Sequence, residues 1–380
     1  MKIKYGMVGG DLNAFIGDVH RKAINFEQNV DLVAGCFSNH LEDNQATGEF
    51  YNLQKDRVYV DFQTMAKEEA KREDKIDFVV IVTPNFIHYD VAKEFLLQGF
   101  NVVCEKPLCF TVEQAEELEK LAKEKDVLFA VTYAYSGYTM VKFAKQLVKD
   151  GKIGDILNIN AEYPQDWLLG EVAEADSKLN LSVWRMDPKY SGVSNCVGDI
   201  GTHIENTVKY ITGLKVEKVA AKLNRYGKAL DLNANMLVQF ENGVFGSFWS
   251  SQIAAGNGNG LRVRVYGTEG SLEWWQETPD FLRFAKRDGS VERLSRGYGY
   301  VYGRASDLAR VPAGHPEGYY EAFANIYKTF VQALRKKLNG EKLTEEDLDF
   351  PNVTDGLEGV KFVHAVVKSD GKDSTWVELK

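Results

Sequence analysis

Short apolar runs alternate with amphipathic, helix-like segments over the first third of the chain. The strand-like runs cover residues 3–8, 30–36, 78–82, 102–105 and 127–131, and the helix-like segments cover residues 15–26, 41–53, 87–98 and 111–125. Strands that alternate with helices imply crossover connections and a parallel sheet. We therefore predict an α/β protein whose residues 1–135 form a doubly wound, dinucleotide-binding Rossmann domain.

The pattern changes after Gly154, where longer segments alternate apolar and polar residues with a period of two. These segments cover residues 156–163, 216–224, 235–240, 244–253, 261–266 and 271–275, and turn signals such as residues 241–243 join neighbours as hairpins. We predict a large, open and mostly antiparallel sheet, covered on one face by helices at residues 201–211, 319–338 and 356–367. Residues 136–380 then form a second, α+β domain that binds the substrate.

Composition narrows the class of protein. A chain of 380 residues, 44% of them hydrophobic, suits a globular enzyme of about two domains. It contains no run of the roughly 20 apolar residues that span a bilayer, and its N-terminus leads directly into a strand, so we expect a cytoplasmic protein. The net charge of −9 and the lack of a Lys/Arg-rich run argue against nucleic acid or membrane as the main partner.

The four cysteines indicate neither a disulfide framework nor a metal site. Cys36, Cys104, Cys109 and Cys196 show no CxxC spacing, which a zinc site would favour. We expect four buried, inert thiols and no bound metal.

The first turn carries glycines where a phosphate would bind. Gly9 and Gly10 end the first strand, and Asn13, Phe15 and Ile16 follow at the start of the helix. Glycines allow the backbone to approach a pyrophosphate, and a helix N-terminus supplies N–H donors and a positive dipole. We predict that these residues contact a dinucleotide; a plain turn is the alternative.

The ends of the other parallel strands should meet the same ligand, because open α/β sheets bind ligands at their carboxyl edge. Ser38 follows the second strand, where neither an Asp nor an Arg is present, so NAD and NADP both stay open, with NAD favoured. Turn and capping chemistry also explains Thr83 and Asn85, and His88 is as well suited to a structural role. The residues expected along the cofactor at these two further strand ends are Thr83, Pro84, Asn85, His88, Glu105 and Lys106.

Four motifs together resemble one family. VGG in the first turn, VTPNFIH, VVCEKPL and GDIGTH are similar in kind and order to the Gfo/Idh/MocA family, named for glucose–fructose oxidoreductase and inositol dehydrogenase. The first turn departs from the commoner GxGxxG form and resembles a branch with AFIG and VHR after the glycines. The resemblance implies an NAD(P)-dependent oxidoreductase acting on sugars or polyols, assembled as a homodimer or homotetramer. It also implies a catalytic set of Lys106, Asp199 and His203.

These three residues suit the oxidation of a secondary alcohol. Asp199 and His203 are four apart on a helical segment and so share a face. His203 is the candidate base, because imidazole titrates near neutral pH, and Asp199 is expected to orient it or to hold a substrate hydroxyl. The cation of Lys106 would stabilise the developing alkoxide.

Aromatic and polar residues in the second half suit a carbohydrate, which has an apolar ring face and a hydroxyl rim. Pro164 gives the YPQDW segment an alternative explanation as a strand end. The expected substrate-binding residues are Tyr163, Gln165, Trp167, Trp184, Arg185, Asn206 and His315.

The leading hypothesis is a dehydrogenase of a sugar, cyclitol or glycoside. One alternative is an NAD-dependent glycosidase, in which transient oxidation of the ring permits elimination and no net NADH appears. A non-catalytic nucleotide or sugar sensor is the other alternative, because fold does not dictate function.

Overall fold

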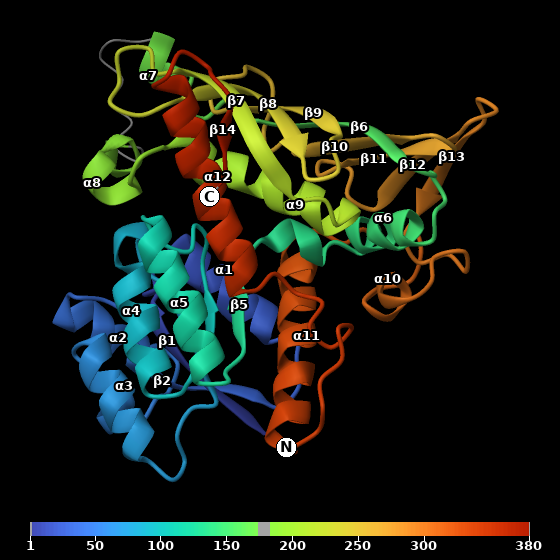
Figure 1. The fold of residues 1–380 in the computed structure, drawn as a ribbon. Helices are drawn as coiled ribbons and strands as arrows, with labels where there is room; N and C mark the ends of the chain where they lie inside the picture. The colour runs from blue at the N-terminus through green and yellow to red at the C-terminus, as the bar shows by residue number, and fades with distance from the viewer. Residues whose placement is uncertain (1, 174–182, 380) are drawn as a thin grey trace. The chain divides into compact units, whose positions relative to one another are not determined.

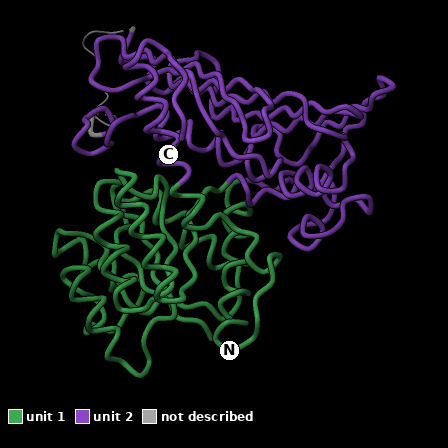
Figure 2. The backbone as a smooth tube through the Cα atoms, viewed as in Figure 1, with its two compact units in different colours: residues 1–134, 319–357 green, residues 135–318, 358–380 purple. Residues whose placement is uncertain are grey.

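The computed structural model describes residues 2–173 and 183–379, whose helices and strands are drawn in Figure 1. The chain forms two compact units, each built from two separate stretches of sequence (Figure 2). Unit 1 consists of Met1–Ala134 and Tyr319–Leu357, and unit 2 of Tyr135–Gly318 and Glu358–Lys380. The chain therefore returns to unit 1 late in the sequence.

A parallel five-stranded sheet forms the centre of unit 1 within the described residues, in the order β2-β1-β3-β4-β5. All residues of β3 and β4 are buried, as expected for central strands covered on both faces. The predicted Rossmann fold is therefore confirmed. The strands are β1 (Ile3–Gly9), β2 (Val30–Cys36), β3 (Phe78–Val82), β4 (Asn101–Cys104) and β5 (Phe129–Val131).

The helices of unit 1 follow the predicted alternation. A capping box at α5, in which the Thr111 and Gln114 side chains each accept from the other's backbone N–H, shows how the sequence sets a helix start. The helices are α1 (Phe15–Ile24), α2 (Leu41–Phe50), α3 (Phe62–Lys71), α4 (His88–Leu97), α5 (Val112–Glu124) and α11 (Tyr319–Leu338), with 3₁₀ turns η1 (Lys55–Arg57) and η2 (Asn85–Ile87). The helix α12 (Val353–Asp370) begins in unit 1 and ends in unit 2.

Helix α11 packs on the Rossmann sheet, whereas the sequence analysis placed it on the second sheet. The Phe330 ring meets Phe78 of β3 edge to face at 5.3 Å, and Phe323, Tyr327 and Phe330 belong to the core that also contains β1 residues. The predicted domain boundary is therefore wrong for residues 319–357. The apolar stripe of α11 identified a buried helix but not the sheet that buries it.

A nine-stranded sheet forms unit 2 in the part of the chain that is described, in the order β13-β12-β11-β10-β6-β9-β8-β7-β14. Its neighbours pair antiparallel, apart from β6 and β9, which pair parallel. The strands are β6 (Ile156–Pro164), β7 (Val216–Asn224), β8 (Asn233–Phe240), β9 (Phe245–Ser251), β10 (Arg262–Gly267), β11 (Gly270–Trp275), β12 (Phe281–Lys286), β13 (Val291–Ser295) and β14 (Val377–Glu378). The predicted open, mostly antiparallel sheet is confirmed, and β12 to β14 extend it beyond the predicted strands.

Helices cover one face of this sheet. Helix α9 packs against β6 and β10, and α6 packs against β11 and β12. The buried positions of β8 alternate with exposed ones, so its other face is open. The helices are α6 (Thr139–Lys149), α7 (Gly170–Ala173), α8 (Pro188–Ser191), α9 (Thr202–Thr212) and α10 (Arg304–Asp307), with short turns η3 (Ala134–Gly137), η4 (Val183–Met186) and the π-helical η5 (Val197–Gly201).

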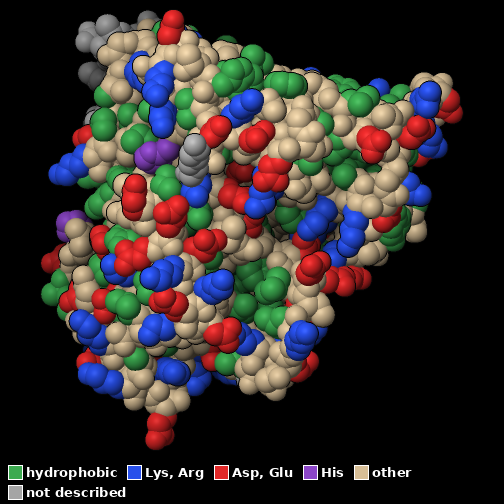
Figure 3. All heavy atoms as spheres, viewed as in Figure 1, with side chains coloured by type: hydrophobic (Ala, Val, Ile, Leu, Met, Phe, Trp, Pro, Cys, Tyr) green, Lys and Arg blue, Asp and Glu red, His purple; other side chains and the backbone are tan. Residues whose placement is uncertain are grey.

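The surface and the cysteines agree with the composition. Acidic and basic side chains are interspersed over the face shown in Figure 3. Among the described residues, no helix has the length and apolar character needed to cross a membrane, and the cytoplasmic location stays a prediction. The four thiols are free and buried, as expected, and burial raises the pKa of Cys36 to about 12.

The packing of α11 predicts a large effect of one core substitution. Phe330→Ala leaves a cavity between α11 and the rings of Phe78 and Phe350, and we expect it to lower the free energy of unfolding by about 3–5 kcal/mol. Urea unfolding followed by circular dichroism measures the loss. Leu338→Ala, at the exposed end of the same helix, is the control and should stay within about 0.5 kcal/mol of the wild type. Equal midpoints for the two variants would contradict the placement of α11.

Candidate functional site

The glycine turn between β1 and α1 brings three backbones close together. Gly9 and Gly10 have φ of +80° and +74°, which L side chains rarely adopt. A Cβ on Gly10 would lie 2.8 Å from Cγ2 of Val82 and 3.0 Å from Cα of Gly17. Only glycine therefore fits where the ends of β1 and β3 meet the start of α1.

The start of α1 is open to a ligand. The Asp11 carboxylate accepts from the backbone N–H of Asn13 at 2.9 Å, so it serves the turn. Ala14, the residue before the helix, supplies no side-chain cap, and Phe15 is 72% exposed. The first N–H groups of α1 are thus uncapped by a side chain, as a pyrophosphate site requires.

At the end of β2 the structure places neutral side chains. The Ser38 hydroxyl accepts from the backbone N–H of His40 at 3.2 Å, and Asn39 and His40 are exposed. The Asn44 amide holds the turn by accepting from the backbone N–H of Phe37 at 2.7 Å. No acidic side chain directly follows the described end of this strand, so its geometry does not select between the two nicotinamide dinucleotides.

The end of β3 carries a buried hydroxyl. The oxygen of the Thr83 hydroxyl is buried and has no hydrogen-bond partner among the described residues. Such a group costs free energy unless a ligand or water completes it. Pro84 is exposed and Asn85 begins the following 3₁₀ turn, so both lie at the edge where the cofactor is expected.

His88 holds two loops together. It is fully buried, with Nδ1 2.8 Å from the carbonyl oxygen of Pro107 and Nε2 2.9 Å from that of Thr83. Burial lowers the pKa of His88, although the two carbonyls favour its protonated form. Because both ring nitrogens face the backbone, the contacts fit a structural clamp rather than the predicted cofactor contact.

The end of β4 carries a buried carboxylate next to Lys106. Glu105 Oε1 lies 3.0 Å from Nε2 of His20 and accepts from the Thr132 hydroxyl, while Oε2 accepts from the backbone N–H of Lys106 at 3.2 Å. Burial would raise the pKa of Glu105, but His20, Lys106 and Thr132 outweigh it and lower that pKa. Glu105 is thus an ionised anchor for the lysine loop, and His20 and Thr132 are partners that the sequence analysis missed.

A polar network in unit 2 holds Asp199. Its carboxylate accepts from the Gln252 amide at 3.0 Å, and Gln252 in turn accepts from the Asn195 side chain at 2.7 Å. The Asp231 carboxylate accepts from the backbone N–H groups of Asn195 and Val197, both at 3.0 Å. Burial raises the pKa of Asp231. The π-helical turn that carries Asp199 is therefore fixed by side chains from elsewhere in the unit.

His203 lies among aromatic rings. Its ring meets Tyr135 edge to face, with centroids 4.8 Å apart, and the Tyr163 ring lies 6.1 Å away. The hydroxyls of Tyr135 and Tyr163 are hydrogen-bonded to each other, and Tyr163 also donates to the Asn259 side chain at 2.5 Å. Burial raises the pKa of Tyr135 well above its ordinary value.

The rest of the YPQDW segment joins this cluster. Gln165 donates to the Asn259 side chain at 2.7 Å and accepts from the Trp167 indole N–H at 3.0 Å. The sequence analysis did not include Asn259, which lies in the glycine-rich segment of residues 256–260; the two asparagines of that segment were the available signal. The guanidinium of Arg185 lies 5.5 Å from the centre of the Trp167 ring.

Of the remaining predicted substrate-binding residues, one is buried, one is exposed, and the side chain of the third lies outside the described structure. Asn206 is buried, and its side-chain oxygen has no hydrogen-bond partner in the described structure. His315 lies on an exposed loop, where Nδ1 is 3.3 Å from the carbonyl oxygen of Pro312. The Trp184 side chain lies outside the described part of the structure. The described residues contain no cluster of three metal-binding side chains.

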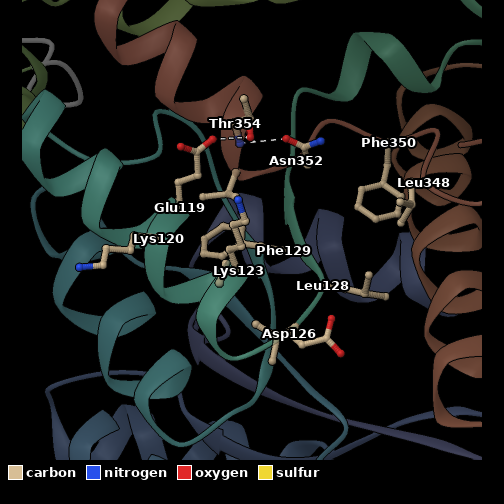
Figure 4. Close-up of a pocket in the computed structure, with 13 residues that line it drawn as sticks. Glu119, Lys120, Lys123, Asp126, Leu128, Phe129, Leu348, Phe350, Asn352 and Thr354 are labelled. Atoms are coloured by element: carbon tan, nitrogen blue, oxygen red, sulfur yellow. Dashed lines mark hydrogen bonds between the residues drawn. The ribbon is translucent and has the colours of Figure 1, made fainter. Parts of the chain in front are cut away.

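A groove of about 770 Å³ in unit 1 is a separate feature (Figure 4). It is lined by the second half of α5, the start of β5 and residues 348–354, where the Thr354 hydroxyl donates to Glu119 at 2.5 Å. None of the predicted site residues line it. It lies at the amino end of β5 and not at the carboxyl edge that carries the chemistry.

The fold and the carboxyl-edge chemistry define a Rossmann nucleotide-binding protein, and comparison with known proteins identifies its family. The model for the oxidoreductase family with an NAD-binding Rossmann fold matches residues 3–133, and the GFO/IDH/MocA C-terminal domain matches residues 141–273. An uncharacterized oxidoreductase of Bacillus subtilis (strain 168) is 33% identical over 383 residues, which are 100% of this chain and 97% of the relative. The chain belongs to the Gfo/Idh/MocA family of NAD-binding oxidoreductases.

Two further relatives have named substrates or ligands. An inositol dehydrogenase homologue from Azotobacter vinelandii, solved with NAD+, is 34% identical with a TM-score of 0.93 and covers 100% of this chain and 97% of its own. An inositol dehydrogenase homologue from Azotobacter vinelandii solved with NADH and myo-inositol is 32% identical with a TM-score of 0.90 and covers 100% of this chain and 98% of its own. Levoglucosan dehydrogenase from Pseudarthrobacter phenanthrenivorans is 29% identical over 334 residues, which are 80% of each chain.

The glycine turn fits an NAD pyrophosphate and generates a binding prediction. Gly10→Ala places a Cβ against Val82 and Gly17, and we expect it to raise the dissociation constant for NADH by more than about tenfold. Fluorescence titration of NADH measures this. Gly99→Ala is the matched control, because Gly99 has a similar φ of +79° but no heavy atom within 4 Å of the added Cβ. Equal NADH affinity in the two folded variants would contradict the assignment of the turn.

Proposed function

We propose that this oxidoreductase transfers a hydride between a secondary alcohol of a sugar, cyclitol or glycoside and the nicotinamide of NAD, with NADP as the other cofactor to be tested. The observation that carries the proposal is the unit 2 cluster, in which aromatic faces of Tyr135, Tyr163 and Trp167 lie beside the amides of Gln165 and Asn259. Such surfaces suit a polyhydroxylated ring. The myo-inositol complex and the levoglucosan dehydrogenase among the relatives support the same substrate class.

Each residue of the proposed site has a separate role in the oxidation of the alcohol. Bound NAD supplies the hydride acceptor. His203 takes the hydroxyl proton, and Asp199, held by Gln252, orients the substrate hydroxyl or the imidazole. Lys106 supplies positive charge to the developing alkoxide. Thr83, with its buried hydroxyl, and the Gly9–Gly10 turn bind the cofactor.

The substrate contacts extend from the same cluster. Asn206 offers a buried side-chain oxygen, and Arg185 adds a cation beside Trp167. We propose both as substrate-binding residues, together with Trp184 and the exposed His315.

The open face of the unit 2 sheet suits a contact between copies of the chain. Leu237, Phe245 and Tyr266 are exposed at 57%, 51% and 40%, and Leu237 borders a hollow of about 430 Å³ on the sheet. Exposed apolar patches of this kind mark interaction surfaces. We propose a homodimer or homotetramer.

Light scattering after gel filtration tests the assembly. We expect a mass of two or four times the 42.8 kDa of one chain. Leu237→Lys on the exposed face should shift the mass toward that of one chain, because a charge buried in an interface is costly. A wild-type mass of 42.8 kDa at micromolar concentration would contradict the proposal.

A substrate screen tests the activity. Absorbance of reduced nicotinamide is followed while sugars, inositols and glycosides are added with NAD or NADP, and we expect a rise with at least one of them. Consumption of a glycoside without that rise would instead identify cleavage by transient oxidation. Binding of NAD without any conversion would favour the sensor.

The catalytic roles predict the behaviour of two variants. Lys106→Met and His203→Asn should each lower kcat by about 100-fold or more, because they remove charge stabilisation and proton transfer. Lys120→Met, in the groove of Figure 4, is the control and should keep wild-type turnover. Unchanged turnover in either catalytic variant would refute its role.

A further inference from the structure

A chain of buried polar side chains runs through unit 1 behind Lys106. The Tyr327 hydroxyl of α11 lies 2.6 Å from Nδ1 of His20 on α1, and Nε2 of His20 lies 3.0 Å from Oε1 of Glu105. His20 and Tyr327 are fully buried, and Glu105 is 7% exposed. His20 is the histidine of the VHR segment after the first turn, to which no role has been assigned, and Tyr327 lies outside the four motifs, so their burial next to the lysine loop calls for a role.

The contacts determine the direction of the hydrogen bonds. Burial raises the pKa of Tyr327 well above its ordinary value, so its hydroxyl stays protonated and donates. Glu105, whose pKa is lowered, is a carboxylate and only accepts. A neutral His20 ring that accepts at Nδ1 and donates from Nε2–H satisfies both neighbours. The accepting carboxylate at Nε2 and the donating hydroxyl at Nδ1 therefore both favour the tautomer with its proton on Nε2.

The Glu105 carboxylate connects the His20 ring to the backbone of Lys106. Glu105 Oε2 accepts from the backbone N–H of Lys106, and the next residue, Pro107, is held through its carbonyl by His88 at 2.8 Å. The Glu105 backbone N–H donates to the Ile81 carbonyl at 3.0 Å, which ties the loop to β3. The position of the Lys106 backbone thus depends on a carboxylate whose orientation depends on His20.

We infer that His20 and Tyr327 are positioning residues for Lys106: through Glu105 they fix the lysine loop and keep a compensating negative charge beside it. The inference rests on the proposed function, in which Lys106 stabilises the alkoxide. The charge of Lys106 is in turn one of the causes that lower the pKa of Glu105, so the carboxylate stays ionised next to the lysine. Helix α11, which comes from the far end of the sequence, then contributes to the catalytic edge of the Rossmann sheet.

Other titratable groups face the same network. Cys104, Lys106 and His88 lie close enough to Glu105 to interact with its charge, and Tyr5 interacts with Tyr327. Burial raises the pKa of Tyr5 well above its ordinary value, so Tyr5 does not titrate in the acidic range, and an acidic pH effect of a Tyr327 substitution reports on the chain from Tyr327 to Glu105.

The decisive variant is Tyr327→Phe, which removes one hydroxyl and keeps the ring in the core. His20 loses the donor at Nδ1, and Glu105 is then the one remaining partner of the two that favours the Nε2–H tautomer, so Glu105 loses its Nε2–H partner for part of the time and its pKa rises. We expect kcat to fall about tenfold, the equivalent of one lost buried hydrogen bond, with KM for the alcohol within about twofold. The acidic limb of the kcat profile should move to higher pH.

Two further variants separate positioning from folding. Tyr59→Phe is the matched control, because it removes another buried tyrosine hydroxyl that donates to a buried glutamate, Glu69, at 2.9 Å in the same unit. It should leave kcat and the pH profile unchanged. At position 20, His20→Gln keeps an N–H donor for Glu105 and should retain more kcat than His20→Leu. Equal kcat and pH profiles in Tyr327→Phe and Tyr59→Phe would overturn the inference.

A measurement without turnover keeps the inference separate from the proposed function. Nitrogen-15 NMR of the histidine rings in the wild-type protein should show a neutral His20 protonated at Nε2, and Tyr327→Phe should change that tautomer. If no substrate of the panel is converted, the proposed function fails while the NMR result still decides the order of the network. A His20 ring protonated at Nδ1 alone would refute the positioning role even in an active enzyme.

Discussion

A carboxylate buried at the carboxyl end of β4 constrains much of unit 1. Glu105 is almost inaccessible to water, and an ionised carboxylate in such a place must be met by donors. Its donors come from α1, from the residue after β5 and from the backbone of Lys106. Satisfying one charge therefore aligns a helix, two strand ends and the lysine loop. The glycine turn and the Thr83 hydroxyl lie at the ends of the adjoining strands, on the same edge.

The sheet of unit 2 differs from that of unit 1, because helices cover one of its faces and the other face is open. The covered face carries the polar cluster around His203 and the network that fixes Asp199. Buried Asp231 and Gln252 hold the π-helical turn on which Asp199 lies. Burying these polar side chains costs free energy unless each of them is hydrogen-bonded. The requirement for full pairing therefore favours one arrangement of the network.

The chemical character of its residues, more than the size of a cavity, distinguishes the candidate cofactor site from the rest of the surface. The groove beside α5 is roomy, but its lining combines exposed lysines with apolar side chains and includes neither the Gly9–Gly10 turn, nor Thr83, nor the EKP segment. The carboxyl edge of the sheet, by contrast, concentrates a phosphate-compatible turn, the buried Thr83 hydroxyl, which has no hydrogen-bond partner among the described residues, and the buried Glu105 carboxylate, which accepts from the Lys106 backbone.

The sequence alone determined the features that depend on neighbours along the chain. Alternation of short apolar runs with helices predicted the parallel sheet, and period-two segments predicted the second sheet, because both patterns report which side of a local element is buried. The motifs also predicted Gly9, Gly10, Thr83, Lys106 and the YPQDW segment as site residues, and these assignments stay predictions. Only the tertiary structure decided that α11 packs on the first sheet, that His88 clamps two loops, and that His20, Tyr327, Tyr135 and Asn259 join the polar networks. An apolar helix face fits any apolar surface, and a hydrogen bond between residues 20 and 327 leaves no periodic signal, so these pairings exist only once the chain has folded.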